Sequence, residues 1–81
     1  MNIRKNIAVS ETGFIFNPLT GDSFSVNNVG VFILQQLKAG NSQQQITESL
    51  IAEYELDANT AEKDLYDFFS MLQSYQLTEN E

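Results

Sequence analysis

The stretch GFIFNPLTGDSFSV, residues 13–26, decides the fold of this chain, because two short apolar runs flank a turn within it. Pro18 presets one backbone dihedral of the turn, and Gly21 tolerates a positive φ. Apolar residues recur at alternate positions on each side of the turn, and residues two apart in a strand share a face. The stretch therefore predicts a β-hairpin.

A further strand is predicted just before the hairpin. Ile7 and Val9 alternate there with Ala8 and Ser10, which is the pattern of a short, half-buried strand. We therefore expect a three-stranded antiparallel sheet with one apolar side and one partly polar side. The residues expected on the apolar side are Ile7, Val9, Phe14, Phe16, Phe24 and Val26.

The rest of the chain predicts three helices, over about 28–39, 43–55 and 60–75, and the third is capped by Asp57 or Asn59. Each helix carries an apolar stripe that it cannot bury alone. We therefore expect the helices to pack together, with the sheet along their flank. The stripes consist of Val29, Phe32, Ile33, Leu34 and Leu37, then Ile46, Leu50, Ile51 and Tyr54, then Ala61, Leu65, Phe68, Phe69 and Leu72.

Local signals mark the ends of the first two helices. Asn27 or Asn28 is placed to cap the first helix, and Gly40 is placed to end it in a left-handed conformation. Ser42 followed three residues later by Gln45 fits a capping box at the start of the second helix.

The order of these elements is three strands followed by three helices, βββααα. It predicts a small α+β domain with a winged-helix-like arrangement. A length of 81 residues fits one domain, and we expect it to span 1–81. Residues 1–5 and 78–81 are polar, and we expect them to form disordered tails.

Composition excludes several classes of function. The chain has no Cys and no His, so thiolate chemistry, disulfides and His or Cys metal ligands are excluded. No apolar run approaches the about 20 residues of a membrane span, and the N-terminus lacks the apolar stretch of a signal peptide. We therefore expect a cytoplasmic protein that does not associate with membranes.

Acidic residues offer the only candidates for catalysis or metal binding. Asp64 and Asp67 lie three apart on the third predicted helix, a spacing more typical of a solvated acidic face than of an acid–base pair. The run 53–57 alternates oxygen ligands as a calcium loop does. Ala58 and Asp64 then stand where such a loop needs Gly and Glu. We expect no enzyme activity, no catalytic residue, no cofactor and no metal site.

Charge also disfavours nucleic acid as a partner. The net charge is −7, from eleven acidic and four basic residues. Winged helices often contact DNA through the third helix, but here Glu62, Asp64 and Asp67 accompany a single Lys63. Because phosphate binding depends on Lys and Arg, we expect no nucleic-acid binding.

Two features favour a peptide or protein as the ligand. A three-stranded sheet on a small domain has an exposed edge, whose unpaired N–H and C=O groups can accept another strand. On the third helix, Asp64, Phe68, Met71 and Tyr75 fall on one flank of the apolar stripe. Met and Tyr suit interfaces, although Met71 and Tyr75 are equally well explained as residues at the boundary of the core.

Several short sequence features follow one another along the chain, and their order and spacing are informative. They are residues 13–18, residues 20–24, Val26-Asn27, Gly30, Tyr54, Leu56-Asp57, Asp64, Phe68, Phe69 and Leu72. Their order and spacing, from about Ile7 to Leu77, resemble the PqqD family of peptide chaperones, which belongs to the wider class of RiPP recognition elements. RiPPs are ribosomally made, post-translationally modified peptides. The chain departs from the family pattern at Gln76, where a Gly is frequent, and in the third strand, which often has more aromatic residues.

The resemblance implies a concrete function. Such domains bind the leader segment of a precursor peptide, which adds as a strand to the third strand and lies beside the third helix. The domain performs no chemistry and delivers the peptide to a modifying enzyme, commonly a radical S-adenosylmethionine (radical SAM) enzyme. The residues expected to bind the leader are Asp22, Ser23, Phe24, Ser25, Val26, Asp64, Leu65, Asp67, Phe68, Met71, Leu72 and Tyr75.

Two alternatives remain open at the level of sequence. One is an acidic winged-helix subunit with a structural or regulatory role, which never meets a peptide. The other is a DNA-binding winged helix, which the charge of the third helix disfavours.

Overall fold

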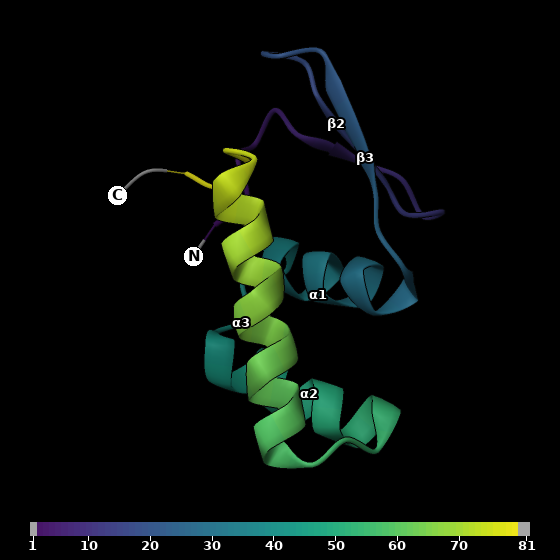
Figure 1. The fold of residues 1–81 in the computed structure, drawn as a ribbon, viewed down its shortest axis with the longest axis vertical. Helices are drawn as coiled ribbons and strands as arrows, with labels where there is room; N and C mark the ends of the chain where they lie inside the picture. Colours follow the sequence, from purple (N-terminus) through teal and green to yellow (C-terminus); the bar gives the residue numbers. More distant parts are fainter. Residues whose placement is uncertain (1, 80–81) are drawn as a thin grey trace.

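The computed structural model describes residues 2–79, which form three strands followed by three helices (Figure 1). This order confirms the expected α+β fold. The elements are β1 (Ala8–Val9), β2 (Phe14–Asn17), β3 (Asp22–Ser25), α1 (Asn28–Lys38), α2 (Gln43–Tyr54) and α3 (Ala58–Ser74).

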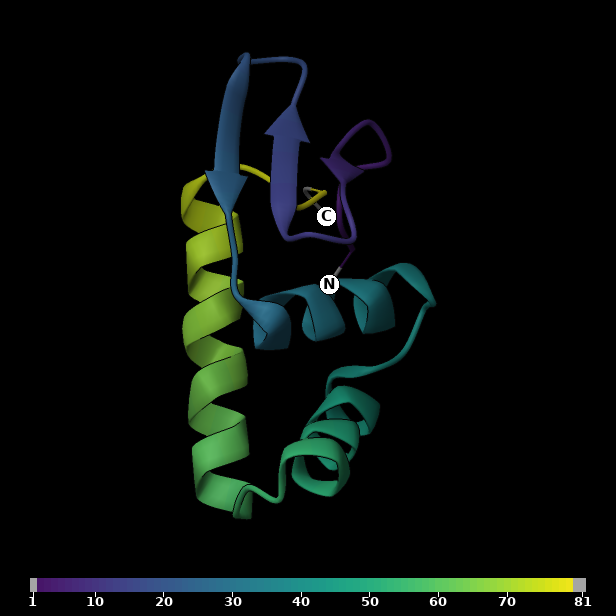
Figure 2. The ribbon, with the colours of Figure 1, turned by 90° about the vertical axis from the view of Figure 1, so that its right-hand side faces the viewer.

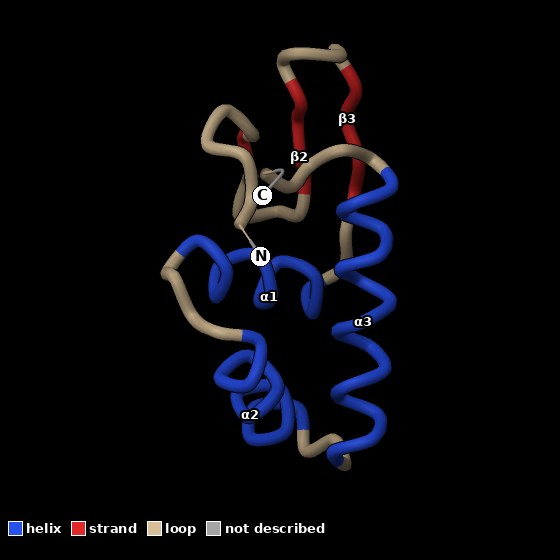
Figure 3. The backbone as a smooth tube through the Cα atoms, turned by 90° about the vertical axis from the view of Figure 1, so that its left-hand side faces the viewer, coloured by secondary structure: helices blue, strands red, loops and turns tan. Residues whose placement is uncertain are grey.

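The long helix α3 runs along one side of the molecule, beside β3, α1 and α2 (Figure 2). Figure 2 shows the sheet at one end of the molecule, α1 beneath the sheet and α2 at the far end. Figure 3 shows from the opposite side that the C-terminal half of α3 lies next to β3. The sheet and the C-terminal half of α3 are therefore neighbours, and the start of α1 lies close to both.

The strands pair in the antiparallel order β1-β2-β3. Asn17 and Gly21 set the hairpin: the Asn17 carbonyl accepts a hydrogen bond from the Gly21 N–H at 2.8 Å, and Gly21 has a φ of 78°. The Asn17 side chain in turn accepts the Leu19 N–H at 3.0 Å. These bonds fix the register in which Ile15 faces Phe24 and Phe14 faces Ser25.

The sheet faces the core with a different set of residues from the one expected. Ile15 is completely buried, whereas Phe14 and Phe16 are 58% and 43% exposed. The prediction that both Phe side chains point inward is therefore wrong. Residues 14–16 are all apolar, so alternation within β2 does not distinguish its two faces; the pairing with Phe24 does, because Phe24 packs against the core.

Caps predicted from the sequence stabilise the helices. Asn27 caps α1, with its Oδ1 atom accepting the Gly30 N–H at 2.9 Å. Ser42 and Gln45 form both hydrogen bonds of the capping box at the start of α2. These local bonds satisfy backbone donors that a helix N-terminus leaves without partners.

Asp57 caps α3, which therefore begins at Ala58 rather than at the expected Thr60. The Asp57 Oδ1 atom accepts the Thr60 N–H at 2.7 Å. This backbone hydrogen bond, with a weaker contribution from the Thr60 hydroxyl, holds the pKa of Asp57 below its usual value. Hydrogen bonds to the charged form of a carboxylate are the physical cause of such a shift.

One apolar core joins the sheet, the helices and both ends of the described chain. Burial of such side chains is the main favourable term in folding. The buried apolar residues are Ile3, Ile7, Ile15, Ile33, Leu34, Leu37, Ile46, Leu50, Ala61, Leu65, Phe69, Leu72 and Leu77.

The two ends of the described chain pair with each other. Ile3 forms an antiparallel bridge with Thr78, and both residues are buried. The Arg4 N–H donates to the Leu77 carbonyl at 3.0 Å. The expectation of disordered tails is therefore wrong for residues 2–5 and 78–79, because pairing between the two ends was not visible in the local sequence. Residues 1, 80 and 81 lie outside the described residues.

No helix within residues 2–79 combines the length and the apolar character needed to cross a membrane. The longest, α3, has a strongly one-sided distribution of apolar residues, with Ala61, Leu65, Phe69 and Leu72 buried against the core.

We predict that truncating a side chain costs more free energy of unfolding on the inner face of β2 than on its outer face. Ile15→Ala should lower the free energy of unfolding by about 2–5 kcal/mol, the usual cost of truncating a buried aliphatic side chain. Phe16→Ala, on the exposed face, should cost less than about 1 kcal/mol. Urea denaturation of both variants measures the difference. Equal costs would mean that the sheet does not present Ile15 alone to the core.

Candidate functional site

The outer edge of β3 is free in the described part of the chain. β3 is the last strand of the sheet, with β2 on one side only. The Val26 N–H donates to the Gly13 carbonyl at 2.8 Å, so these residues form a hydrogen-bonded pair. Because such pairs alternate along an antiparallel ladder, the N–H and C=O groups of Ser23 and Ser25 point away from β2. They are available to another strand.

The C-terminal end of α3 lies beside this edge (Figure 3). The rings of Phe24 and Tyr75 stack with centroids 4.3 Å apart and planes inclined by 38°. Tyr75 is still 48% exposed, so the stack forms part of the surface. Aromatic pairs of this geometry contribute about 0.5–1.5 kcal/mol beyond burial, and this one ties β3 to α3.

A hollow of about 410 Å³ lies between the start of α1 and α3. Residues from both helices and the preceding cap line it. The apolar part of the lining includes Val29 of α1 and Phe68 and Met71 of α3, which are all half-buried. The lining residues are Asn27, Val29, Gly30, Ile33, Asp64, Asp67, Phe68 and Met71.

Gly30 permits the close approach of α1 to α3 beside this hollow. A Cβ atom at Gly30 would lie 2.8 Å from the Val26 Cβ atom and 3.0 Å from a ring carbon of Phe68. Both distances are shorter than ordinary van der Waals contact, so a larger residue would push these side chains into the hollow. No residue of α1 is among those expected from the sequence to bind the leader; the Gly inside an apolar helical run is the signal that points to this side of the site.

Acidic groups border the hollow on the α3 side. Asp67 pairs with Lys63 at 3.3 Å between Oδ2 and Nζ, in an exposed i,i+4 arrangement. Asp64 forms no ion pair within residues 2–79. Exposed pairs such as the one at Asp67 are weak, so the rim keeps an acidic character that favours a basic group.

The structure brings most of the predicted peptide-binding residues together at the surface. Asp22, Ser23 and Ser25 are exposed on β3, and Phe24 and Val26 are half-buried. On α3, the side chains of Asp64, Asp67, Phe68, Met71 and Tyr75 all retain exposed area.

Leu65 and Leu72 do not reach the surface, and their prediction as walls of the site is wrong. Both are completely buried. They point to the centre of the apolar stripe, whereas Met71 is half-buried, one position away from Leu72 around the helix. The position of Met71 on the flank of the apolar stripe is confirmed, because Met71 is less buried than Leu72. Leu65 and Leu72 support the site from beneath.

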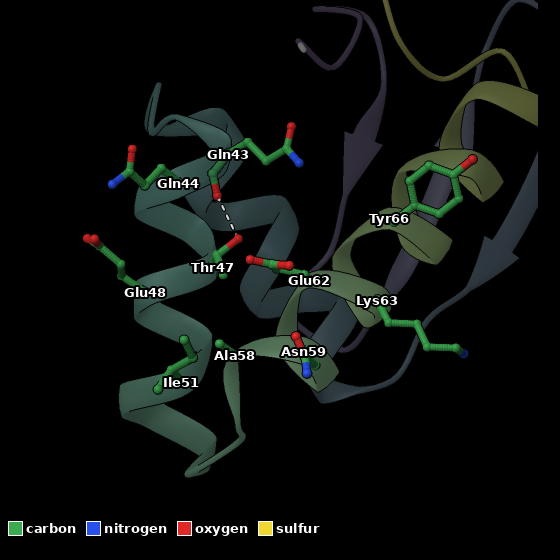
Figure 4. Close-up of a pocket in the computed structure, with 10 residues that line it drawn as sticks. All are labelled: Gln43, Gln44, Thr47, Glu48, Ile51, Ala58, Asn59, Glu62, Lys63 and Tyr66. Atoms are coloured by element: carbon green, nitrogen blue, oxygen red, sulfur yellow. Dashed lines mark hydrogen bonds between the residues drawn. The ribbon is translucent and has the colours of Figure 1, made fainter.

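A second, larger hollow of about 880 Å³ lies between α2 and α3 (Figure 4). Its lining mixes polar and apolar residues, and the side chains of Gln44 and Glu48 point away from α3. No group of three acidic side chains gathers anywhere in the described chain to hold a metal ion. We place the candidate site at β3 and α3 instead, because a free strand edge lies there beside half-buried apolar side chains.

Comparisons with known proteins identify the family and the fold of this chain. The family described as "Coenzyme PQQ synthesis protein D (PqqD)" matches residues 12–77. The solved structure "TbiB1 in Complex with the TbiA(beta) Leader Peptide" is 28% identical in sequence and matches with a TM-score of 0.91. The match covers 100% of this chain and 98% of TbiB1.

A second solved structure shares the fold. It is described as "Lasso peptide synthetase B1 complexed with the leader peptide", and it matches with a TM-score of 0.87 at 23% identity. The match covers 98% of this chain and 96% of that one. No curated protein matches the sequence.

We predict that Phe24 and Tyr75 are energetically coupled. In a double-mutant cycle of Phe24→Leu and Tyr75→Ala, the coupling should be about 0.5–1.5 kcal/mol in the free energy of unfolding. The matched control replaces Tyr75→Ala by Tyr66→Ala, on the same helix, where the ring is 69% exposed and makes no aromatic pair within the described residues. Its coupling with Phe24→Leu should be below about 0.5 kcal/mol. Equal couplings would contradict the role of the stack in joining β3 to α3.

Proposed function

Because the chain belongs to the PqqD family, we propose that it is a RiPP recognition element, which binds the leader segment of a precursor peptide and presents it to a modifying enzyme. The observation that carries this proposal is the free edge of β3 beside the half-buried flank of α3. The match to TbiB1, which was solved with a leader peptide, supports the same assignment.

In this proposal the leader adds to the sheet as a further strand. Ser23 and Ser25 supply outward N–H and C=O groups, two residues apart, as the ladder of β3 with the leader requires. These backbone bonds provide affinity and fix the register whatever the leader sequence. Specificity then depends on the leader side chains, which point alternately to the two faces of the sheet.

The leader side chains that point toward the cleft would meet apolar side chains of β3 and α3. Phe24 and Tyr75 offer stacked rings at one end, and the hollow beside Phe68 and Met71 can take an apolar side chain at the other. Asp64 at the rim favours a leader with Lys or Arg nearby, and added salt should weaken this preference.

The role of the domain is delivery rather than catalysis. The site offers a strand edge, apolar side chains and exposed carboxylates, which suit the binding of a peptide. The partner enzyme in this proposal modifies the bound precursor, and the family resemblance suggests a radical SAM enzyme. We place this event in the cytoplasm, where a chain without Cys needs no oxidising compartment.

We predict that leader binding is seen first at the edge of β3. Titration of the ¹⁵N-labelled domain with the leader of a precursor encoded beside its gene should shift the amide signals of residues 22–26. Ser25→Pro should abolish binding, because Pro removes an N–H that faces the free edge. Ser25→Ala is the matched control, since it keeps this N–H and should bind normally. Unmoved amides in residues 22–26 would exclude strand addition at β3.

We also predict that Met71 contributes more to binding than to folding. Met71→Ala should cost less than the about 2–5 kcal/mol of a fully buried truncation, but it should weaken leader binding by about 1 kcal/mol or more. Leu72→Ala is the control, because Leu72 is completely buried and its loss should mainly affect stability. Calorimetry and thermal melting measure the two effects. The opposite result is a sharp loss of stability in Met71→Ala while its affinity for the leader changes by less than about twofold, which is smaller than the loss expected of an interface contact. Met71 would then be a residue at the boundary of the core.

A further inference from the structure

The outer face of the sheet carries two exposed aromatic rings that the leader cleft does not use. Phe14 and Phe16 point away from the core and are 58% and 43% exposed. Their cross-strand partners on this face are Ala8, Ser23 and Ser25, so none of these paired positions carries a charge, in a chain with eleven acids and four bases. Adjoining exposed aromatic rings form apolar surface of the kind that interaction sites use.

The register places these rings in line with the free edge. Phe16 pairs with Ser23, and Phe14 pairs with Ser25. Both are non-hydrogen-bonded pairs, in which the Cα atoms lie about 4.5 Å apart and the side chains stand close together. Each ring therefore begins a row that crosses β3 at a serine and reaches the edge of the sheet.

A strand added to β3 would continue both rows. It would hydrogen-bond to the backbones of Ser23 and Ser25, and residues in such bonded pairs lie about 5.5 Å apart and point to the same face. An outward-facing residue of the added strand would thus lie about 10 Å from the Cα atom of Phe14 or Phe16, since the two spacings add. Only a serine side chain would stand between them.

Ser23 and Ser25 leave room for contact between the Phe rings of β2 and the outward-facing side chains of an added strand. Ser23 and Ser25 are both exposed, and their hydroxymethyl groups are too short to separate a phenyl ring from a long side chain approaching from the other side. Aromatic and long side chains reach even diagonal neighbours about 7–8 Å away in a sheet, so two such side chains that lean toward each other over a serine can close the remaining gap. A large residue on β3 at either position would block this contact.

We propose that Phe14 and Phe16 form a second recognition surface for the leader, contacting its outward-facing side chains above Ser25 and Ser23. This inference rests on the proposed strand addition at β3. It specifies the ligand further: the leader carries long apolar or aromatic side chains at two positions separated by one residue, on the face opposite the cleft. The domain then reads the leader on both faces of the sheet.

The probe for the test is a displayed library of randomised ten-residue peptides, selected against the unmodified domain. The best binder is then titrated against three proteins: the unmodified domain, the double variant Phe14→Ser/Phe16→Ser and the control Leu19→Ser. Leu19 lies in the hairpin turn, outside both rows, and is 72% exposed. The double variant should bind about fivefold more weakly, the range that cross-strand contacts allow. Leu19→Ser should change affinity by less than about twofold, as expected of a residue outside the contacts.

A second selection gives a readout that folding alone would not change. Peptides selected against the unmodified domain should be enriched in large apolar residues on both faces of the added strand. Peptides selected against the double variant should lose this enrichment at the outward positions and keep it at the inward ones. Thermal melting checks that the variants remain folded, as the exposure of both rings predicts.

The outcomes separate this inference from the proposed function. A selected peptide that shifts the amides of residues 22–26, with affinity and enrichment unaffected by the double variant, overturns the role of Phe14 and Phe16 only. The aromatic face would then be left for another protein, such as the modifying enzyme. If no selected peptide shifts these amides, strand addition fails and the inference fails with it.

Discussion

The pairing of Ile15 with Phe24 is the contact on which the arrangement of this domain depends. Side chains in a strand alternate with a period of two, so a slip of one residue would exchange the two faces of β2. In the observed register Ile15 is completely buried and Phe24 packs against the core. The same register turns the backbone of Ser23 and Ser25 to the free edge. The register of β2 and β3 thus determines which residues face the core, which line the cleft and which lie on the outer face.

The end of α3 is held in place by residues far away in the sequence. Gln76 adopts a left-handed conformation with a φ of 58°, and the Arg4 Nε atom donates to its carbonyl at 2.9 Å. Leu77 then enters the core and is completely buried. These contacts turn the chain sharply after Tyr75 and keep its ring against Phe24. The geometry of the cleft therefore depends on the two ends of the described chain, which pair with each other.

The sequence predicts those features of the fold that depend on neighbouring residues. The capping box at Ser42, the caps at Asn27 and Asp57, and the offset of Met71 from the buried stripe follow from local hydrogen bonding and helical spacing. The orientation of β2 does not, because three successive apolar residues carry no alternation. The pairing of Ile3 with Thr78 does not either, since it joins segments at opposite ends of the chain. The contribution of α1 to the site likewise needed the packing of Gly30 against α3.

An open strand edge is also a hazard, because it can pair with the edge of a second copy. The composition of this chain limits that reaction while leaving the edge accessible. Ser23 and Ser25 give the edge a polar surface, and Asp22 places a charge at its start. The net charge of −7 makes two copies repel each other, whereas a leader with basic residues is attracted. Charge therefore favours a basic leader over a second copy of the chain at the edge of β3, whereas the backbone hydrogen bonds would form equally with either.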